Sequence, residues 1–353
     1  MMKSKLNLIK YSILINILRK FLSVGALMKI ISKIKNKLLN KSDMYRFYEN
    51  EYKTNTERIN KLEKQFKRYK RRNNKIINSY NSLFNSLYIY NEIEPKPLVK
   101  LSRELVMEIL DFIDNVCKKQ DMQWWLFGGT LLGAIRHEGY IPWDDDIDIN
   151  MMREDYEKFY KIFPGELEKY GLSEHIEINT STRTKDGIYL PFIKLNYWLG
   201  HENLAFIDIF PTDYIYDLIP DHEKVHKEEN RAIRKRLSEG ENRETVLNDA
   251  FEKLHVSKEK TEQIMVGVED GIATLACDYD VVFPLTKTKF ESRVYPCPRD
   301  YKLYLQGLYG ENYMRIPKAP AIHGYYDYLS THENVLQKLE DAIAIVHEAN
   351  EKF

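Results

Sequence analysis

Residues 124–149 read WWLFGGTLLGAIRHEGYIPWDDDIDI. The apolar run at 124–128 predicts a strand that turns at Gly128 and Gly129 into a helix over 130–136. Small residues at such a turn let a phosphate approach the backbone closely and meet the N–H groups at the helix N-terminus. We therefore expect Gly128 and Gly129 to contact a phosphate group.

Carboxylates follow this turn in an alternating pattern. Asp146 and Asp148 flank Ile147, so on a predicted strand at 146–150 both acids project from one face while Ile147 points into the core. The segment 207–209, Ile-Asp-Ile, repeats the arrangement around Asp208. Neighbouring acids repel one another unless a cation compensates them, and an all-oxygen site selects Mg²⁺ or Mn²⁺. The pattern predicts a metal site made of Asp146, Asp148 and Asp208, rather than a merely acidic turn.

Three carboxylates that hold a divalent cation suit the transfer of a phosphoryl group from a nucleotide-activated donor to a hydroxyl. In this interpretation Asp208 is also a candidate to take the acceptor's proton. Two alternatives use similar acids: a nucleotidyltransferase that consumes an NTP, and a glycosyltransferase whose Asp-x-Asp motif holds a sugar nucleotide. The residues themselves leave these alternatives open.

The remaining pattern predicts an α+β fold with a mixed sheet and flanking helices. Strands are expected at 176–180, 190–195 and 206–210, and helices at 101–116, 153–170, 301–309 and 333–351, with a charged and mostly helical segment at 221–262. Pro95 and Pro97 interrupt the helical pattern. We predict segments at 1–42 (basic, amphipathic), 43–91 (coiled coil), 92–100 (linker), 101–330 (catalytic domain) and 331–353 (C-terminal helix).

The formal net charge is zero, yet the first 91 residues carry about +16 and the remainder about −16. Within the basic part, apolar residues from Leu27 to Leu38 recur at helical spacing with lysines on another face, which predicts a helix lying on an anionic membrane surface. Packing on protein is the alternative. Arg19 and Lys20 interrupt the apolar N-terminal stretch, so no spanning helix and no cleaved signal are predicted.

Apolar residues from Tyr45 to Leu87 follow steps of three and four, with one break at Asn55 and the polar Asn73 at one core position. This heptad pattern predicts a coiled coil and self-association through it, although packing of the helix on the catalytic domain is an alternative. The basic run 67–75 has no aromatic platform around it, so no nucleic-acid partner is expected. Cys117, Cys277 and Cys297 lack CxxC spacing, which favours a reducing cytoplasm. The predicted location is cytoplasmic, peripheral at the inner face of the membrane.

The chain resembles the LicD family of phosphotransferases, to which fukutin-related proteins are also similar. The resemblance lies at 128–148, at 207–213 (IDIFPTD) and at 305–314 (LQGLYGENYM). It implies a nucleotidyltransferase-like fold that moves a phospho-alcohol, typically phosphocholine from CDP-choline, onto a cell-surface glycan such as a lipopolysaccharide or a teichoic acid precursor. The first 95 or so residues lie outside the family core, and Phe127 stands where members often carry an acid.

The resemblance also implies roles for individual residues. Asp146, Asp148 and Asp208 become the metal ligands, Asp144 and Asp145 supporting acids, and Thr130 joins Gly128 and Gly129 in a phosphate-binding turn. Arg136 and Lys194 are candidate phosphate clamps, or else surface ion-pair partners. His137 is an acid/base candidate or a helix-end histidine satisfied by the fold. A quaternary ammonium would need an aromatic face, for which Trp124, Trp125, Trp143 and Trp198 are the candidates.

Overall fold

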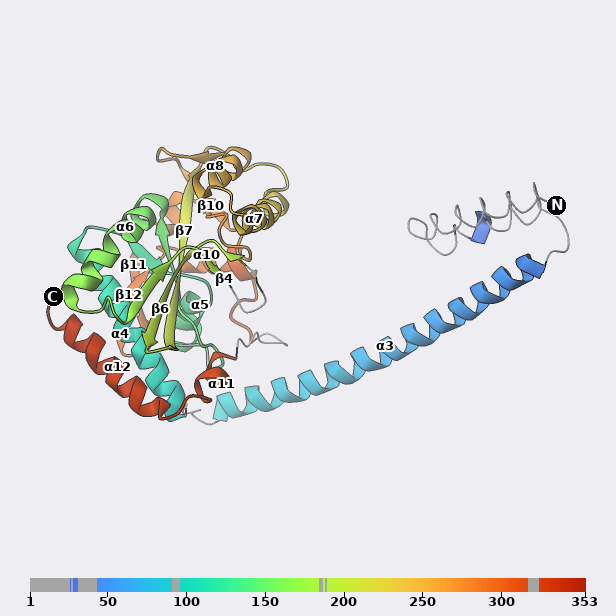
Figure 1. The fold of residues 1–353 in the computed structure, drawn as a ribbon, viewed down its shortest axis with the longest axis horizontal. Helices are drawn as coiled ribbons and strands as arrows, with labels where there is room; N and C mark the ends of the chain where they lie inside the picture. Colours follow the sequence, from blue (N-terminus) through green and yellow to red (C-terminus); the bar gives the residue numbers. More distant parts are fainter. Residues whose placement is uncertain are drawn as a thin grey trace. The chain divides into compact units, whose positions relative to one another are not determined.

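The computed structural model describes residues 26, 28–30, 43–90, 96–183, 187, 189–316 and 324–353 (Figure 1). The chain divides into two compact units, Met1–Tyr80 and Asn81–Phe353. Apart from the helical residues 28–30, the predicted amphipathic helix lies outside the described residues, as does the first part of the predicted linker, 92–95.

Residues Asp43–Tyr90 form a single helix of 48 residues, α3. Most side chains of its predicted heptad stripe that the structure describes are solvent-exposed, with Phe66 66% and Tyr80 64% exposed, whereas Tyr52 and Asn73 are half-buried. A solvent-exposed apolar stripe is what a coiled-coil seam looks like on an isolated helix. The pairing of this stripe with a second helix remains a prediction.

A mixed sheet forms the centre of the larger unit. Its main strand order is β1-β2-β7-β6-β3, in which β2 and β7 run parallel and the other neighbours antiparallel. Further short strands extend the sheet beside the end of β7. The strands are β1 Trp124–Leu126, β2 Asp148–Met152, β3 Ile176–Asn179, β6 Ile193–Leu199, β7 Glu202–Ile215, β8 Val256–Ser257, β9 Gln263–Val266 and β10 Ala276–Asp278. The predicted α+β class with a mixed sheet is confirmed.

Helices pack against this sheet and against each other. α4 (Pro97–Lys119), α6 (Arg153–Tyr170) and α12 (Val335–Asn350) lie together on one side of the larger unit (Figure 1). The Asn350 side-chain amide of α12 donates to the Glu108 backbone oxygen of α4 at 3.0 Å. α6 and α10 (Tyr301–Tyr309) span the residues that the sequence predicted.

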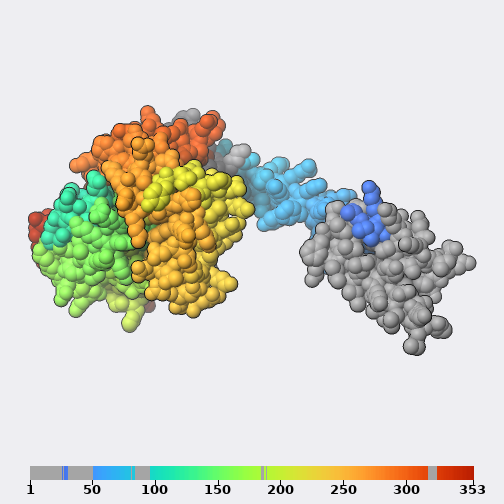
Figure 2. Space-filling view, turned by 90° about the horizontal axis from the view of Figure 1, so that it is seen from above, coloured from blue at the N-terminus to red at the C-terminus, as the bar shows by residue number. Residues whose placement is uncertain are grey.

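A smaller hydrophobic core lies beneath α7 (His222–Ser238) and α8 (Arg243–Lys253). Ile233 and Leu237 of α7 pack there with Val246 and Leu247 of α8. The surface of this segment adjoins that of the strands that follow it (gold beside orange in Figure 2). The remaining elements are short: β4 Thr182–Arg183, β5 Tyr189–Leu190, α5 Gly128–His137, α9 Tyr279–Val282, β11 Thr286–Phe290, β12 Arg293–Cys297 and α11 Tyr325–Leu329.

Some predicted strand boundaries are wrong. β2 begins at Asp148, so Asp146 lies in the preceding loop rather than on the strand. β2 begins at Asp148 because the pairing between β2 and β7 begins with Asp148 opposite Asp208. β7 is 14 residues long, well beyond the predicted 206–210, since it pairs with β6 along its first half and with β8 and β9 near its end.

Within the described residues, no helix combines the length and the apolar composition that a bilayer crossing requires.

A buried ion network ties three elements of the larger unit together. Arg153, at the start of α6, donates to both oxygens of Asp213 on β7 at 2.7 Å and to Glu269, after β9, at 2.6 and 2.9 Å. The Asp213 and Glu269 side chains are 1% and 0% exposed. Carboxylates so deeply buried need their cation, because water cannot replace it.

Arg153→Met is expected to lower the free energy of unfolding by about 3–5 kcal/mol, since it removes the cation of the buried Asp213 and leaves the buried Glu269 with the longer contact to Arg243 at 3.4 Å. Urea unfolding of the full chain measures this. Arg236→Met is the matched control, because its partners Glu241 and Asp249 have side chains that are 43% and 50% exposed; it should cost less than about 1 kcal/mol. Equal unfolding midpoints for the two variants would contradict the assignment.

Candidate active site

The turn between β1 and α5 brings its backbone against two carboxylates. Phe127 is extended and Gly128 adopts a φ of +52°, a conformation that favours glycine. A Cβ at Gly128 would lie 3.0 Å from Asp148 Oδ2, and one at Gly129 would lie 2.9 Å from Asp144 Oδ2. The glycines therefore leave room for protein carboxylates. Their contact with a phosphate stays a prediction.

Asp148 and Asp208 are brought together by the sheet. They are directly opposite each other on the parallel strands β2 and β7, and the Asp208 N–H donates to the Ile147 backbone oxygen at 3.0 Å. Ile147 and Ile207 are completely buried, so the isoleucines occupy the core side as the alternation predicts. Thr130 is buried and its hydroxyl oxygen accepts the Asp148 N–H at 2.8 Å. In this structure Thr130 thus fixes the start of β2.

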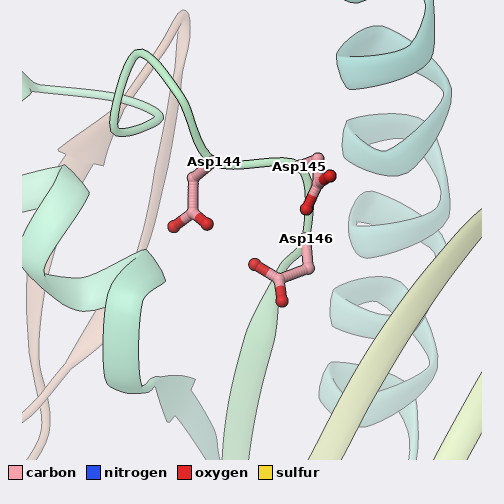
Figure 3. A group of neighbouring side chains, drawn as sticks. All are labelled: Asp144, Asp145 and Asp146. Carbon is pink, nitrogen blue, oxygen red and sulfur yellow. The ribbon is translucent and has the colours of Figure 1, made fainter. Parts of the chain in front are cut away.

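Three consecutive acids precede β2. Asp144, Asp145 and Asp146 have carboxylate oxygens within 4.8 Å of one another, the one such set of three potential metal ligands among the described residues. Figure 3 shows the Asp144 and Asp146 carboxylates turned toward a common space. Asp145 is buried, and its Oδ2 accepts the backbone N–H of Tyr325 at 2.7 Å. This bond gives Asp145 a structural role in holding the loop.

Arg103 of α4 organises the same loop. One of its terminal nitrogens, Nη2, donates to the backbone oxygens of Ile141, Pro142 and Asp144 at 3.1–3.2 Å. Its Nε donates to the Tyr326 hydroxyl, which itself donates to the backbone oxygen of Asp144 at 3.0 Å. Arg103 was not predicted from the sequence; the available signal was a single arginine within an amphipathic helix that carries several other charged residues.

The carboxylates create a strongly negative environment. Burial raises the pKa of Asp148 well above its ordinary value, and the charges of Asp146, Asp208, Asp270 and Asp144 raise it further. Lys194 supplies a local counter-charge to Asp208, because its Nζ lies 2.6 Å from Asp208 Oδ1. Lys194 is therefore held by a site carboxylate, with its ammonium 3.8 Å from the centre of the Phe206 ring.

Asp270 is a further acid that the sequence analysis did not single out. It lies in the loop after β9 and is 5% exposed, and its Oδ1 accepts the N–H groups of Ile272 and Ala273 at 2.7 and 3.1 Å. Burial raises its pKa to about 6. The local signal was a pair of acids, Glu269 and Asp270, that follows the apolar run 264–268, a weaker pattern than the interleaved isoleucines.

These acids line one large cavity of about 2060 Å³. It exceeds the roughly 300–1,000 Å³ of a typical small-molecule site, so it has room for two substrates. Asp145, Thr130, His137 and Lys194 are not part of its wall. Acidic and glycine residues of the wall are Gly128, Gly129, Asp144, Asp146, Asp148, Asp208 and Asp270, and its aromatic residues include Phe127, Trp143, Phe206, Phe210 and Tyr309.

The other predicted binding residues have specific contacts. Arg136 lines the cavity and donates to the backbone oxygens of Tyr313 and Arg315 at 3.1 and 3.3 Å, and to His137 Nε2 at 2.9 Å. Burial and the neighbouring Arg136 charge lower the pKa of His137 to about 4, so its imidazole is neutral at pH 7.

All four tryptophans belong to the described residues, and Trp143 alone among them lines the cavity. Trp124 and Trp125 are buried, and their indole N–H groups donate to Asp114 and the Tyr304 hydroxyl. Trp198 donates to Glu177.

The residues present fit a hard divalent cation. Burial, and after it the charges of the neighbouring carboxylates, raise the pKa of Asp148, and the donor atoms of these acids are all oxygen. Asp144, Asp146, Asp148 and Asp208 share the cavity wall next to Gly128. Among the described residues only Asp144, Asp145 and Asp146 form a set whose oxygens all lie within 4.8 Å, so Asp148 and Asp208 as ligands stay a prediction. Oxygen donors of this kind favour a hard cation over a soft one.

Comparison with known proteins gives relatives for this region. Over 253 residues the chain is 28% identical to the lipopolysaccharide cholinephosphotransferase LicD of Haemophilus influenzae, covering 63% of this chain and 94% of that protein. It is 35% identical over 101 residues to the uncharacterized protein RP689 of Rickettsia prowazekii, covering 28% of this chain and 37% of that protein. It is also 35% identical over 68 residues to human ribitol 5-phosphate transferase FKRP, covering 19% of this chain and 13% of that protein.

Residues 121–239, about a third of the chain, match the model of the LicD/FKTN/FKRP nucleotidyltransferase domain. That range contains Asp144, Asp146, Asp148 and Asp208, whereas Asp270 lies beyond it. The predicted resemblance to the LicD family is thereby confirmed, and it lies in residues 121–239.

Proposed function

We propose that the chain is a metal-dependent phosphotransferase that moves a phospho-alcohol, phosphocholine from CDP-choline in the first instance, onto a hydroxyl of a cell-envelope glycan or teichoic acid precursor. The observation that carries this proposal is the convergence of Asp144, Asp146, Asp148 and Asp208 on one cavity beside the Gly128 turn. The names of the relatives, a cholinephosphotransferase and a ribitol 5-phosphate transferase, support the reaction class.

Asp146, Asp148 and Asp208 are the proposed ligands of Mg²⁺ or Mn²⁺, with Asp144 beside them. When bound, the cation neutralises charge on the phosphate oxygens of the donor. In the reaction the acceptor oxygen forms a bond to phosphorus, the bond from phosphorus to the CMP oxygen breaks, and the acceptor's proton leaves to a base. Lys194 Nζ pairs with Oδ1 of Asp208. Oδ2 of Asp208 is then the oxygen that would bind the cation or accept the acceptor's proton.

The remaining predicted residues have supporting roles in this proposal. Arg136 lines the cavity at 3.1 Å from the Tyr313 backbone oxygen, a position from which its guanidinium can also bind phosphate. The neutral His137 beside it accepts from Arg136 and so orients that guanidinium. Trp143 offers the aromatic face for the quaternary ammonium of choline.

Asp148→Asn and Asp208→Asn should each lower kcat by at least about a thousandfold, because charge stabilisation supplies most of the rate in phosphoryl transfer. Mg²⁺ should raise the Tm of the unmodified protein by mass action and leave that of Asp148→Asn unchanged. The control is Asp280→Asn, whose exposed carboxylate pairs with Arg299 outside the cavity. Unchanged turnover in Asp148→Asn would remove the acids from the mechanism.

The donor is tested by incubating the protein with Mg²⁺, a glycan acceptor and CDP-choline, CDP-ethanolamine, CDP-glycerol or CDP-ribitol. We expect CMP release to be fastest from CDP-choline. Trp143→Leu should lower kcat/KM for CDP-choline about tenfold and that for CDP-glycerol less than twofold, because a cation–π contact contributes about 0.5–2 kcal/mol. Pyrophosphate release from an NTP, or transfer from a UDP-sugar, would point to one of the two alternatives instead.

The N-terminal unit is proposed to determine assembly and location. Its basic composition favours an anionic membrane surface at the cytoplasmic face, and the exposed stripe on α3 favours self-association through a coiled coil.

Replacing Leu62 and Tyr69 of α3 together by lysine should convert the chain to a monomer, because both side chains lie on the exposed stripe. Sedimentation equilibrium of the full chain measures the mass. Lys64→Ala, on the opposite side of the heptad, should leave the oligomer intact. A monomeric unmodified chain would show that the stripe has another partner.

A further inference from the structure

Helix α7 carries two stripes of side chains. One stripe is buried beneath the helix and consists of His222, His226, Asn230, Ile233 and Leu237. The other follows steps of three, four and three and consists of Lys224, Lys227, Arg231 and Arg234, here called the cation row. Steps of three and four keep side chains on one face of a helix, so the four positive charges share one side of α7.

All four residues of the cation row line the cavity that also contains the site carboxylates. Other cations of the same helix are neutralised, because Arg236 pairs with Glu241 and Asp249 and Lys235 lies 3.9 Å from Glu239. Across the described part of the chain, no carboxylate forms an ion pair with a member of the cation row. Its charges are therefore available to a ligand in the cavity.

Arg234, at one end of the row, has a buried polar atom with no protein partner. Its Nε is shielded from solvent and makes no hydrogen bond. A buried N–H of this kind costs free energy unless something accepts from it. A Cβ at Gly271 would lie 2.6 Å from Arg234 Nη2, so the missing side chain lets the guanidinium sit against the loop that carries Asp270.

The cation row extends along α7 from Arg234 to Lys224. From Arg234 to Lys224 the helix rises about 15 Å at 1.5 Å per residue. That length exceeds a single phosphate group. The Arg234 end adjoins the acidic wall through Asp270, whose charge acts on Arg234, while the Lys224 end extends beyond it.

We propose that the cation row binds the phosphate groups of an anionic acceptor, a glycan or polyol chain that contains phosphodiesters, while the donor's diphosphate occupies the acidic wall beside Gly128. The proposal rests on the proposed function, since it assigns the second substrate of the same cavity. A neutral acceptor would leave four unpaired cations along its path. Phosphodiesters neutralise them, and the guanidinium fork of Arg231 or Arg234 matches phosphate oxygens in geometry.

The test compares two triple variants that remove the same charge. Lys224→Gln/Lys227→Gln/Arg231→Gln changes the cation row, and Arg234 is kept because it packs against Gly271. Lys235→Gln/Lys253→Gln/Lys258→Gln changes cations of the neighbouring surface that lie outside the cavity wall. Isothermal titration calorimetry in EDTA measures binding of a synthetic glycerol-phosphate hexamer and of a neutral glycan of equal length. The same instrument measures CDP-choline binding with Mg²⁺.

The unmodified protein and the control variant should bind the hexamer with an affinity that falls as NaCl rises, and should bind the neutral glycan at least about tenfold more weakly. The cation-row variant should lose at least about tenfold in affinity for the hexamer and keep its affinity for CDP-choline within about twofold. Circular dichroism melting checks that both variants are folded.

Three results would overturn the proposal: equal hexamer binding by the two triple variants, no hexamer binding by the unmodified protein, or a loss of CDP-choline binding alone, which would assign the row to the donor. Hexamer binding is measured without turnover and without a metal. It can therefore succeed even if no CDP-alcohol is consumed, and failure of the proposed function is then seen separately from failure of the acceptor site.

Discussion

The parallel pairing of β2 with β7 places Asp148 directly opposite Asp208, and the surrounding structure accommodates the repulsion that results. Two carboxylates side by side in a mostly buried site are unfavourable, as the raised pKa of Asp148 shows. Lys194 neutralises part of this charge. Thr130 fixes the Asp148 backbone and Gly128 leaves room for its carboxylate. The isoleucines on the opposite side of both strands stabilise the pairing by burial.

Local patterns in the sequence predict much of this fold. The helices at 153–170 and 301–309 have the predicted bounds, because their apolar periodicity and terminal residues agree. Alternation around Ile147 and Ile207 is sufficient to predict neighbouring strands with acids on a common side. The strand that was expected to begin at Asp146 begins at Asp148, since the partner strand, and not the local alternation, sets where pairing starts.

Residues that reach the site from distant parts of the chain were not predictable in this way. Arg103 belongs to an amphipathic helix and Asp270 to a loop, and their roles arise only when those elements pack around the acidic loop. The charged helix α7 illustrates the same limit. Its sequence predicts only a charged, mostly helical segment, and the tertiary structure shows that one row of its cations lines a cavity while others are paired.

The docking of α12 on α4 has a consequence for synthesis. Asn350 and His347 of α12 contact Glu108 of α4, the helix that also supplies Arg103 to the acidic loop. Residues 335–350 leave the ribosome last among the elements described, more than 200 residues after α4. The nascent chain must therefore keep an apolar face of α4 uncovered until residues 335–350 have been synthesised. During that interval the chain depends on chaperones or on rapid completion of folding to avoid aggregation.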